Sequence, residues 1–286
     1  MHPLRLKIGS SALTSENLSD AERIALREPD VTIEVAQDGI WLKGADEQRI
    51  HSVAIELRKQ LGENVEIGGL SIDYLETVTR SIEVEGKIKP SPQGYAHVWI
   101  RVGRGEEGKG VTFLNRTVPE VVPGLFIPAV EAGVREALKT GSVAGYPMTD
   151  IEVSLFDGSY HAIDSTEDAF KRAAIDACRT ALAKCDPVLL EPIMFVEVTT
   201  PAENVGNVAG DISSRGGLIA GMDDVPSGML FRAQVPLAHM LGYGTDLAKL
   251  TSGKGVSSMK FSHYAKAPPP EDPDDDEPAS MAMKVA

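Results

Sequence analysis

The sequence predicts an α+β protein in which two domains of one kind flank a domain of another kind. One observation is that strands and helices follow a fixed order before residue 79, and a second is that this order returns after residue 188. A third is that the stretch between them begins with three successive strands and follows a different order. We therefore expect domains at residues 1–79, 80–187 and 188–266, followed by an acidic tail at 267–286.

The first domain reads strand, helix, strand, strand, helix, strand. A helix is predicted over residues 15–28, ahead of Pro29, and Asp38-Gly39 predicts a hairpin turn between two strands. A second helix, in "EQRIHSVAIELRKQLG", brings its apolar residues to one face and ends at Gly62. This order is the split βαβ, or ferredoxin-like, arrangement, in which two helices cover one face of an antiparallel sheet.

The last domain repeats this order. A strand in "PIMFVEVTTP" and a helix in "AENVGNVAGDISSRG" precede a hairpin, and a second helix is predicted over residues 237–253 before a final strand. We therefore expect a second ferredoxin-like sheet. The tail beyond residue 266 has too few apolar residues to offset the entropy of ordering it, so we expect it to be disordered.

The central domain combines strands with two amphipathic helices. The first helix carries Val130, Val134 and Leu138 at intervals of four residues, which predicts one buried face. The second helix is predicted to continue through both cysteines, Cys178 and Cys185. Two turns of helix separate them by roughly 10 Å, which is beyond the reach of a disulfide. We therefore expect packed thiols.

Composition and charge exclude several classes of function. The net charge is −14, and residues 1–270 still carry 36 acidic against 27 basic residues. A broad nucleic-acid-binding face would show a basic excess, so any RNA contact has to be local. The cysteines do not have zinc-finger spacing, and no cofactor or metal is expected. No apolar run is long enough to cross a membrane, which favours the cytoplasm.

The stretch "DGSYHAIDSTEDAF" places His161, Asp164 and Ser165 within five residues of one another. These residue types form hydrolase triads, with serine as nucleophile and histidine as base. Asp164 and Ser165 also stand where a helix begins, with Glu167 and Asp168 three residues later, which is the signature of a capping box. We favour capping, because the G-x-S-x-G turn of a serine hydrolase is absent. No catalytic residue is therefore expected.

Three long stretches together resemble one family. They are "GYPMTDIEVSLFDGSYHAIDSTEDAFKRAAIDA", "VLLEPIMFVEVTTPAENVGNVAGDISSRGG" and "VPLAHMLGYGTDLAKLTSGKGVSSMKFSHY". They are similar to the C-terminal half of bacterial elongation factor G. The resemblance runs from about residue 4 to residue 266 and covers the third, fourth and fifth domains of the factor. It implies that the central domain has the fold of ribosomal protein S5 domain 2.

The resemblance implies a role on the ribosome in moving tRNA and mRNA. The fourth domain of the family reaches the decoding region, and the loop that matches "GSYHAID" contacts tRNA and mRNA there. This implies RNA contact for Ser159, Tyr160, His161 and Asp164. The domain that matches residues 188–266 docks near the stalk base and the sarcin-ricin loop of the ribosomal RNA.

A second loop at the same tip is implied by the stretch "EGKIKPSPQGYAHV". Its candidate RNA contacts are Lys87, Lys89 and Gln93. The loop of the family is longer and rich in glycine, whereas this loop is shortened and carries Pro90 and Pro92. Both alternatives, contact with RNA and no contact, therefore stay open for this companion loop.

The GTPase domain of the family has no counterpart in this sequence. No G-x-x-x-x-G-K-[ST] string occurs, so we expect the chain alone neither to bind nor to hydrolyse GTP. In the family, GTP is bound by that absent domain, and a separately encoded GTPase half is a candidate partner.

Arg215, in "SSRGG", has two interpretations. It either contacts ribosomal RNA or satisfies the last carbonyl groups of a helix. For the whole chain, the first functional hypothesis is a ribosome-binding translation module without its own GTPase. The second is a regulator or decoy that occupies the elongation factor site or binds the factor. The third and least favoured is an enzyme built on His161.

Overall fold

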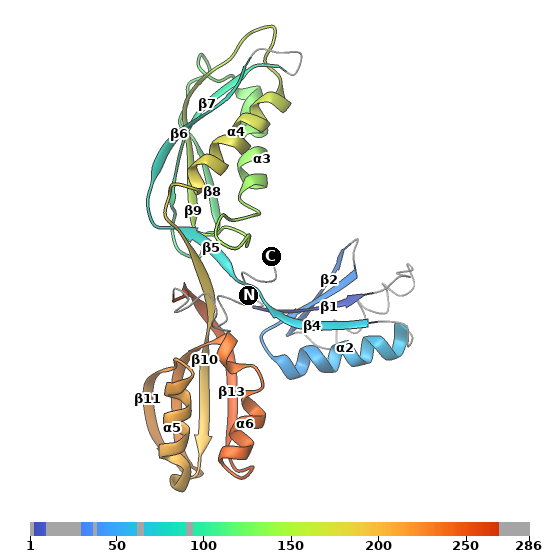
Figure 1. Ribbon diagram of the computed structural model, residues 1–286, viewed down its shortest axis with the longest axis vertical. Coiled ribbons are helices and arrows are strands. Elements are labelled where there is room, and N and C mark those ends of the chain that lie inside the picture. Colours follow the sequence, from blue (N-terminus) through green and yellow to red (C-terminus); the bar gives the residue numbers. More distant parts are fainter. Residues whose placement is uncertain (1–2, 10–29, 37–38, 62–65, 90–93, 269–286) are drawn as a thin grey trace. The chain divides into compact units, whose positions relative to one another are not determined.

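The computed structural model describes residues 3–9, 30–36, 39–61, 66–89 and 94–268 (Figure 1). Helices and sheets both contribute to it, which confirms the predicted α+β class. Contacts divide the chain into two compact units. One unit comprises residues 1–73 and 191–265, and the other comprises residues 74–190 and 266–286. The predicted domain boundaries at residues 79 and 187 stay predictions.

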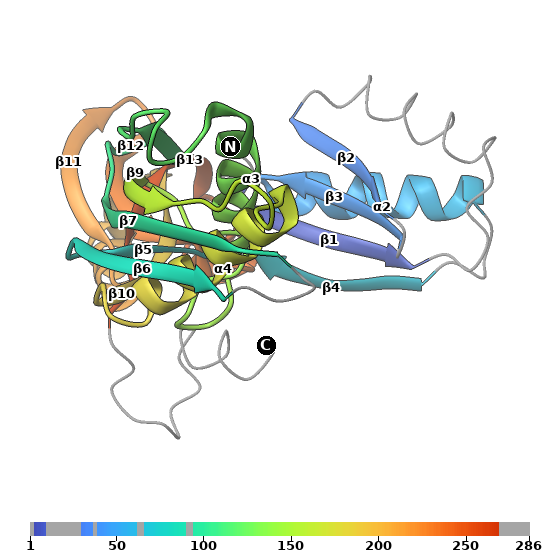
Figure 2. The same cartoon turned by 90° about the horizontal axis from the view of Figure 1, so that it is seen from above.

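The first sheet has the strand order β2-β3-β1-β4, with every described pairing antiparallel. This is the order that a split βαβ unit produces. Figure 2 shows helix α2 running along the sheet. The predicted helix over 15–28 and the predicted stop at Gly62 lie outside the described residues. The elements are β1 (Leu4–Gly9), β2 (Val31–Ala36), β3 (Gly39–Gly44), α2 (Glu47–Leu61) and β4 (Glu66–Ile72).

The second sheet of this unit has the order β11-β12-β10-β13, again that of a split βαβ unit. The predicted single helix over 237–253 is wrong, because the structure has a 3₁₀ turn and then α6. Gly242 separates them, since its φ of 73° is incompatible with a continuous right-handed helix. The elements are β10 (Pro187–Thr200), η2 (Ala202–Asn204), α5 (Val205–Ser214), β11 (Leu218–Val225), β12 (Gly228–Pro236), η3 (Leu237–Met240), α6 (Tyr243–Leu250) and β13 (Val256–Lys266).

The other unit is built on a mixed sheet of order β6-β7-β9-β8, in which β8 runs parallel to β9. Figure 1 shows α3 and α4 together against this sheet. Strand β5 joins the unit by pairing with residues 187–190 of β10. The elements are β5 (Leu75–Val78), β6 (Ile82–Ile88), β7 (Ala96–Arg104), β8 (Val111–Asn115), η1 (Gly124–Phe126), α3 (Ile127–Ala137), β9 (Ile151–Ser159) and α4 (Glu167–Leu182).

The packing of α4 on the sheet decides which face of the sheet stays open. Alternate residues of β7, namely Ala96, Val98 and Ile100, are fully buried in one core with Phe170 and Ala173 of α4. The residues between them therefore point to the opposite face, because side chains alternate along a strand. The outward residues of β6, β7 and β9 thus share one surface, which runs up to the end of β9.

Candidate nucleic-acid interface

The predicted tip loop joins the end of β9 to the start of α4. Ser159 is the last residue of the strand, and the helix begins at Glu167. The loop exposes two large apolar side chains, since Tyr160 is 42% and Ile163 is 86% exposed. An isoleucine that is this exposed gains little packing energy within the chain. The tip loop therefore exposes side chains that a binding partner can contact.

The residue that caps α4 is Thr166, and the predicted capping by Asp164 and Ser165 is wrong. The Thr166 hydroxyl accepts the Ala169 N–H at 3.2 Å. The physical reason lies just before β7, because the Tyr95 N–H donates to the Asp164 carbonyl at 2.8 Å and residue 95 forms a parallel bridge with Ser165. Backbone held in a bridge is extended, so the helix cannot begin before residue 166.

Two reciprocal hydrogen bonds close the loop between His161 and Ser165. The His161 N–H donates to the Ser165 hydroxyl at 2.8 Å, and the Ser165 N–H donates to the His161 carbonyl at 3.0 Å. The His161 Nδ1 lies 2.8 Å from the Asp164 carboxylate, and its side chain is 57% exposed. The serine oxygen is thus an acceptor for the backbone. Among the contacts of the described residues, none joins the His161 ring to that oxygen, so the geometry gives no support to a hydrolase triad.

Sequence reasoning missed the residues that support this loop. The Tyr95 hydroxyl lies 2.7 Å from the Ser159 hydroxyl, and the His97 Nδ1 lies 3.2 Å from the same hydroxyl. The His97 Nε2 lies 3.0 Å from the Glu85 carboxylate. The available signal was the alternation in "GYAHV", which places two polar aromatic side chains on one face of a strand that begins beside the loop.

Part of the predicted companion loop lies beside the tip loop. Lys87 and Lys89 are exposed at the end of β6, and Lys87 is opposite His97 in the sheet. His97 is in turn opposite Ser159, the first residue of the tip loop. Lys87, His97 and Ser159 therefore occupy matching positions on three adjacent strands. Within the described ranges, neither lysine forms an ion pair. Gln93, Pro90 and Pro92 lie outside the described residues.

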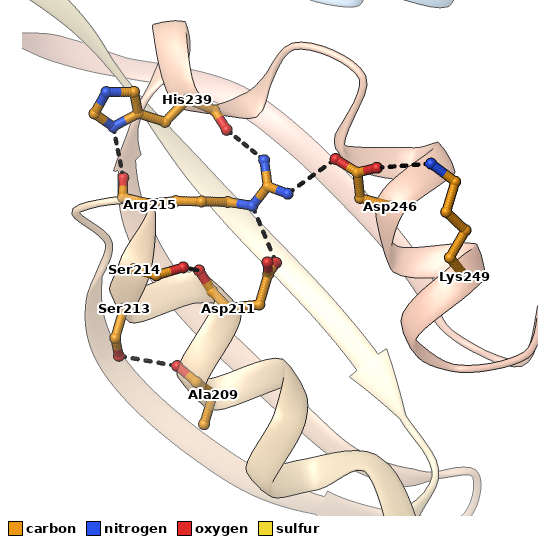
Figure 3. A network of polar contacts seen from close by, with 8 residues as sticks. All are labelled: Ala209, Asp211, Ser213, Ser214, Arg215, His239, Asp246 and Lys249. Carbon is orange, nitrogen blue, oxygen red and sulfur yellow. Dashed lines mark hydrogen bonds and ion pairs between the residues drawn. The ribbon is translucent and has the colours of Figure 1, made fainter. Parts of the chain in front are cut away.

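Arg215 is the C-terminal cap of α5, the helix between β10 and β11 (Figure 3). Its guanidinium donates to Asp211 at 3.0 Å, to the His239 carbonyl at 2.7 Å and to Asp246 at 3.0 Å. It also stands 4.9 Å from the centre of the buried Tyr243 ring. Burial acts to lower the Arg215 pKa, but its hydrogen bonds to the carboxylates of Asp211 and Asp246 outweigh burial and raise it. This geometry supports a structural role at the helix end over contact with RNA.

Other kinds of site find little support in the described part of the chain. Residues 3–9, 30–36, 39–61, 66–89 and 94–268 contain no group of three histidine, cysteine or acidic residues placed to hold a metal ion. Both cysteines are free and buried, and burial raises the pKa of Cys178 to about 12. They are packed thiols, but the prediction that one helix carries both is wrong, because α4 ends at Leu182 and Cys185 follows it. Among the same residues, no helix has the length and apolarity that a bilayer requires.

The described fold thus combines two ferredoxin-like sheets in one unit with a mixed sheet and two helices in the other. Residues 71–186 match the family model for elongation factor G, domain IV, and residues 188–274 match the model for the elongation factor G C-terminus. A crystal structure of a protein from Thermus thermophilus shares 32% sequence identity with a TM-score of 0.73. The similarity covers 94% of this chain and 41% of the Thermus chain. The chain belongs to the elongation factor G family and corresponds to its C-terminal half.

Proposed function

We propose that the chain is a ribosome-binding module of the machinery that moves tRNA and mRNA, and that the tip loop, residues 159–165, contacts RNA. Membership of the elongation factor G family supports a role in translation. The single observation that carries the RNA contact is the tip loop itself, which exposes Tyr160, His161 and Ile163 beside two exposed lysines. Such a role would place the protein in the cytoplasm.

The chemistry of the tip loop suits RNA. An imidazole and a tyrosine hydroxyl can bond to phosphate and ribose, while an aromatic ring can stack on an unpaired base. Lys87 and Lys89 add positive charge at a local point, although the chain as a whole carries a net charge of −14. An acidic protein can bind RNA through a small basic patch of this kind, even though its overall charge is negative.

The test is co-sedimentation of the chain with 70S ribosomes at low salt. We expect binding, and we expect His161→Ala to weaken it about fivefold, because one hydrogen bond to a phosphate or ribose contributes about 1 kcal/mol. His51→Ala, which changes an exposed histidine on α2, is the matched control and should leave the affinity unchanged. Equal affinities for the wild type and His161→Ala would exclude the tip-loop contact.

Translocation assays distinguish a translation module from a regulator or decoy. A module would stimulate movement of tRNA when a GTPase domain is supplied, whether joined to it or separately encoded. A decoy would bind the ribosome and slow translocation by complete elongation factor G. Failure to co-sediment would exclude both forms of direct ribosome binding.

We expect the chain alone to show no GTP hydrolysis above background, because its sequence has no phosphate-binding loop. Purified chain would be incubated with radiolabelled GTP, with and without ribosomes, and released phosphate would be counted. A preparation of complete elongation factor G serves as the positive control. Turnover that follows the purified chain through a further column would contradict this expectation.

A further inference from the structure

Tyr95 holds both ends of the tip loop. Its backbone N–H donates to the Asp164 carbonyl at 2.8 Å, near the end of the loop that enters α4. Its hydroxyl lies 2.7 Å from the Ser159 hydroxyl, at the end that leaves β9. Its ring meets the His161 ring edge-on, with 6.5 Å between centroids. One residue at the start of a neighbouring strand therefore fixes the start, the end and one exposed side chain of the loop.

We propose that Tyr95 is a positioning residue which, through Ser159, His97 and Glu85, holds the tip loop in the conformation that binds RNA. The inference rests on the proposed function, because it explains how the loop proposed to bind RNA is held in one conformation. Tyr95 itself acts through the loop, because its hydroxyl lies 2.7 Å from the Ser159 hydroxyl at the start of the loop.

The hydrogen bonds behind Tyr95 form a chain across three neighbouring strands. His97 on β7 lies directly opposite Ser159 on β9 and contacts Glu85 on β6. The tautomer of His97 that carries a proton on Nε2 is compatible with all these contacts, since it donates to Glu85 and accepts the Ser159 O–H on Nδ1. The Ser159 oxygen then accepts the Tyr95 O–H. Chains in which each bond polarises the next are stronger than isolated bonds.

Gly94, the residue before Tyr95, lets the backbone pass close to the start of α4. Gly94 has a φ of +98°, which side chains rarely allow, and an added Cβ would stand 2.7 Å from the Thr166 hydroxyl that caps α4. A larger residue at position 94 would therefore push the start of β7 away from the helix cap. The glycine allows Tyr95 to reach Asp164 and Ser159 together.

The effect on RNA binding follows from the entropy of the loop. A loop that is already ordered loses less conformational freedom when it binds, so its affinity is higher. Removal of the Tyr95 hydroxyl would break the chain at the β9 end and leave the Asp164 end held by the backbone bond. The loop would then open more often, and its apparent affinity would fall with the fraction of time spent in the binding conformation.

The first measurement is hydrogen exchange in the free full-length chain, which needs no ribosome. Tyr95→Phe removes only the hydroxyl oxygen, so we expect the His161 and Ser165 amides to exchange about threefold to tenfold faster, as local opening becomes more frequent. Tyr264→Phe is the matched control, because the Tyr264 hydroxyl also makes one hydrogen bond, to the Asp73 carbonyl. That control should not alter exchange in the tip loop.

A double-mutant cycle tests whether Tyr95 acts through Ser159. Ser159→Ala should raise exchange at the same amides, and adding Tyr95→Phe should raise it little further, because both changes remove one shared interaction. Fully additive effects would overturn the proposed chain, and so would unchanged exchange in Tyr95→Phe. These outcomes hold whether or not the protein binds RNA.

Ribosome co-sedimentation separates this proposal from the proposed function. We expect Tyr95→Phe to weaken binding about threefold to tenfold, in proportion to the loss of loop order. If His161→Ala weakens binding and Tyr95→Phe does not, the loop contacts RNA but the positioning role is wrong. If neither variant changes binding, the tip-loop contact itself is wrong, and the positioning role for RNA is overturned with it.

Discussion

Glu76→Ala is expected to lower the unfolding free energy of the unit formed by residues 74–190 by about 4 kcal/mol. Glu76 is fully buried on β5, and its carboxylate accepts the backbone N–H groups of Val143, Ala144 and Tyr146 at 2.8, 2.8 and 3.0 Å. Alanine would leave three donors without an acceptor, and each buried orphan costs about 1–3 kcal/mol unless water enters. The loop over residues 141–146 is wrapped around this one side chain.

Urea unfolding followed by tryptophan fluorescence would measure the loss. The chain has two tryptophans, Trp41 and Trp99, so a Trp41→Phe background reports on the unit that contains Trp99. Glu83→Ala is the matched control, because its side chain is 46% exposed and its pairing with Arg101 is worth little. Glu76→Gln should fall between the two, since it keeps one acceptor oxygen. Equal midpoints for Glu76→Ala and Glu83→Ala would show that the buried carboxylate does not hold the loop.

Arg215→Ala is expected to destabilise the second ferredoxin-like sheet by about 3 kcal/mol. Its side chain is only 18% exposed and bonds to Asp211, to Asp246 and to a backbone carbonyl. Hydrogen bonds to charged groups contribute about 1.5–3 kcal/mol each, and their loss is not additive. Arg215→Lys should recover little, because an ammonium lacks the planar fork that reaches three acceptors.

Native-state hydrogen exchange at α5 and β12 would measure this change locally. Arg232→Ala in the same sheet is the control, because its ion pairs with Glu197 and Asp223 are 40–53% exposed and should contribute less than about 1 kcal/mol. If Arg215→Ala lowers the local unfolding free energy no more than the control does, the contacts of Arg215 do not stabilise the end of α5.

The same network predicts a dependence on pH. Hydrogen bonds from Arg215 and Lys249 lower the pKa of Asp246 below its ordinary value of 3.8. A carboxyl whose folded-state pKa is lowered stabilises the fold above its unfolded pKa, and this contribution is lost as the pH falls through the lowered value. The unfolding free energy of Arg215→Ala should therefore fall less steeply than that of the wild type below about pH 4. Parallel curves would exclude this coupling.

Much of the fold was readable from hydrophobic patterns. The period of "EQRIHSVAIELRKQLG" predicted α2, and the returning order of strands and helices predicted two sheets of the same strand order. These features are local, because one strand or helix can be recognised from the residues within it. The single helix predicted over residues 237–253 was wrong for the opposite reason, since the left-handed Gly242 breaks a stretch whose apolar period continues.

The candidate site was only half predictable. The exposed tip loop and His161 followed from the resemblance of the sequence to a family, but the helix cap did not. "DST" offers three capping residues in a row, and local sequence cannot rank them. The bridge between Tyr95 and Ser165 selects Thr166, because it holds Ser165, the residue directly before the cap, in extended backbone.

The sequence by itself determined the class of fold, the family, the presence of α2 and the loop that faces outward. Only the tertiary structure decided what holds that loop and what Glu76 does. Tyr95 and Ser159 are far apart along the chain but meet across the sheet, and Glu76 finds its three donors in a loop that follows α3. Hydrophobic period records which face of an element is buried. It does not record which polar partner lies there, because that partner comes from a distant segment.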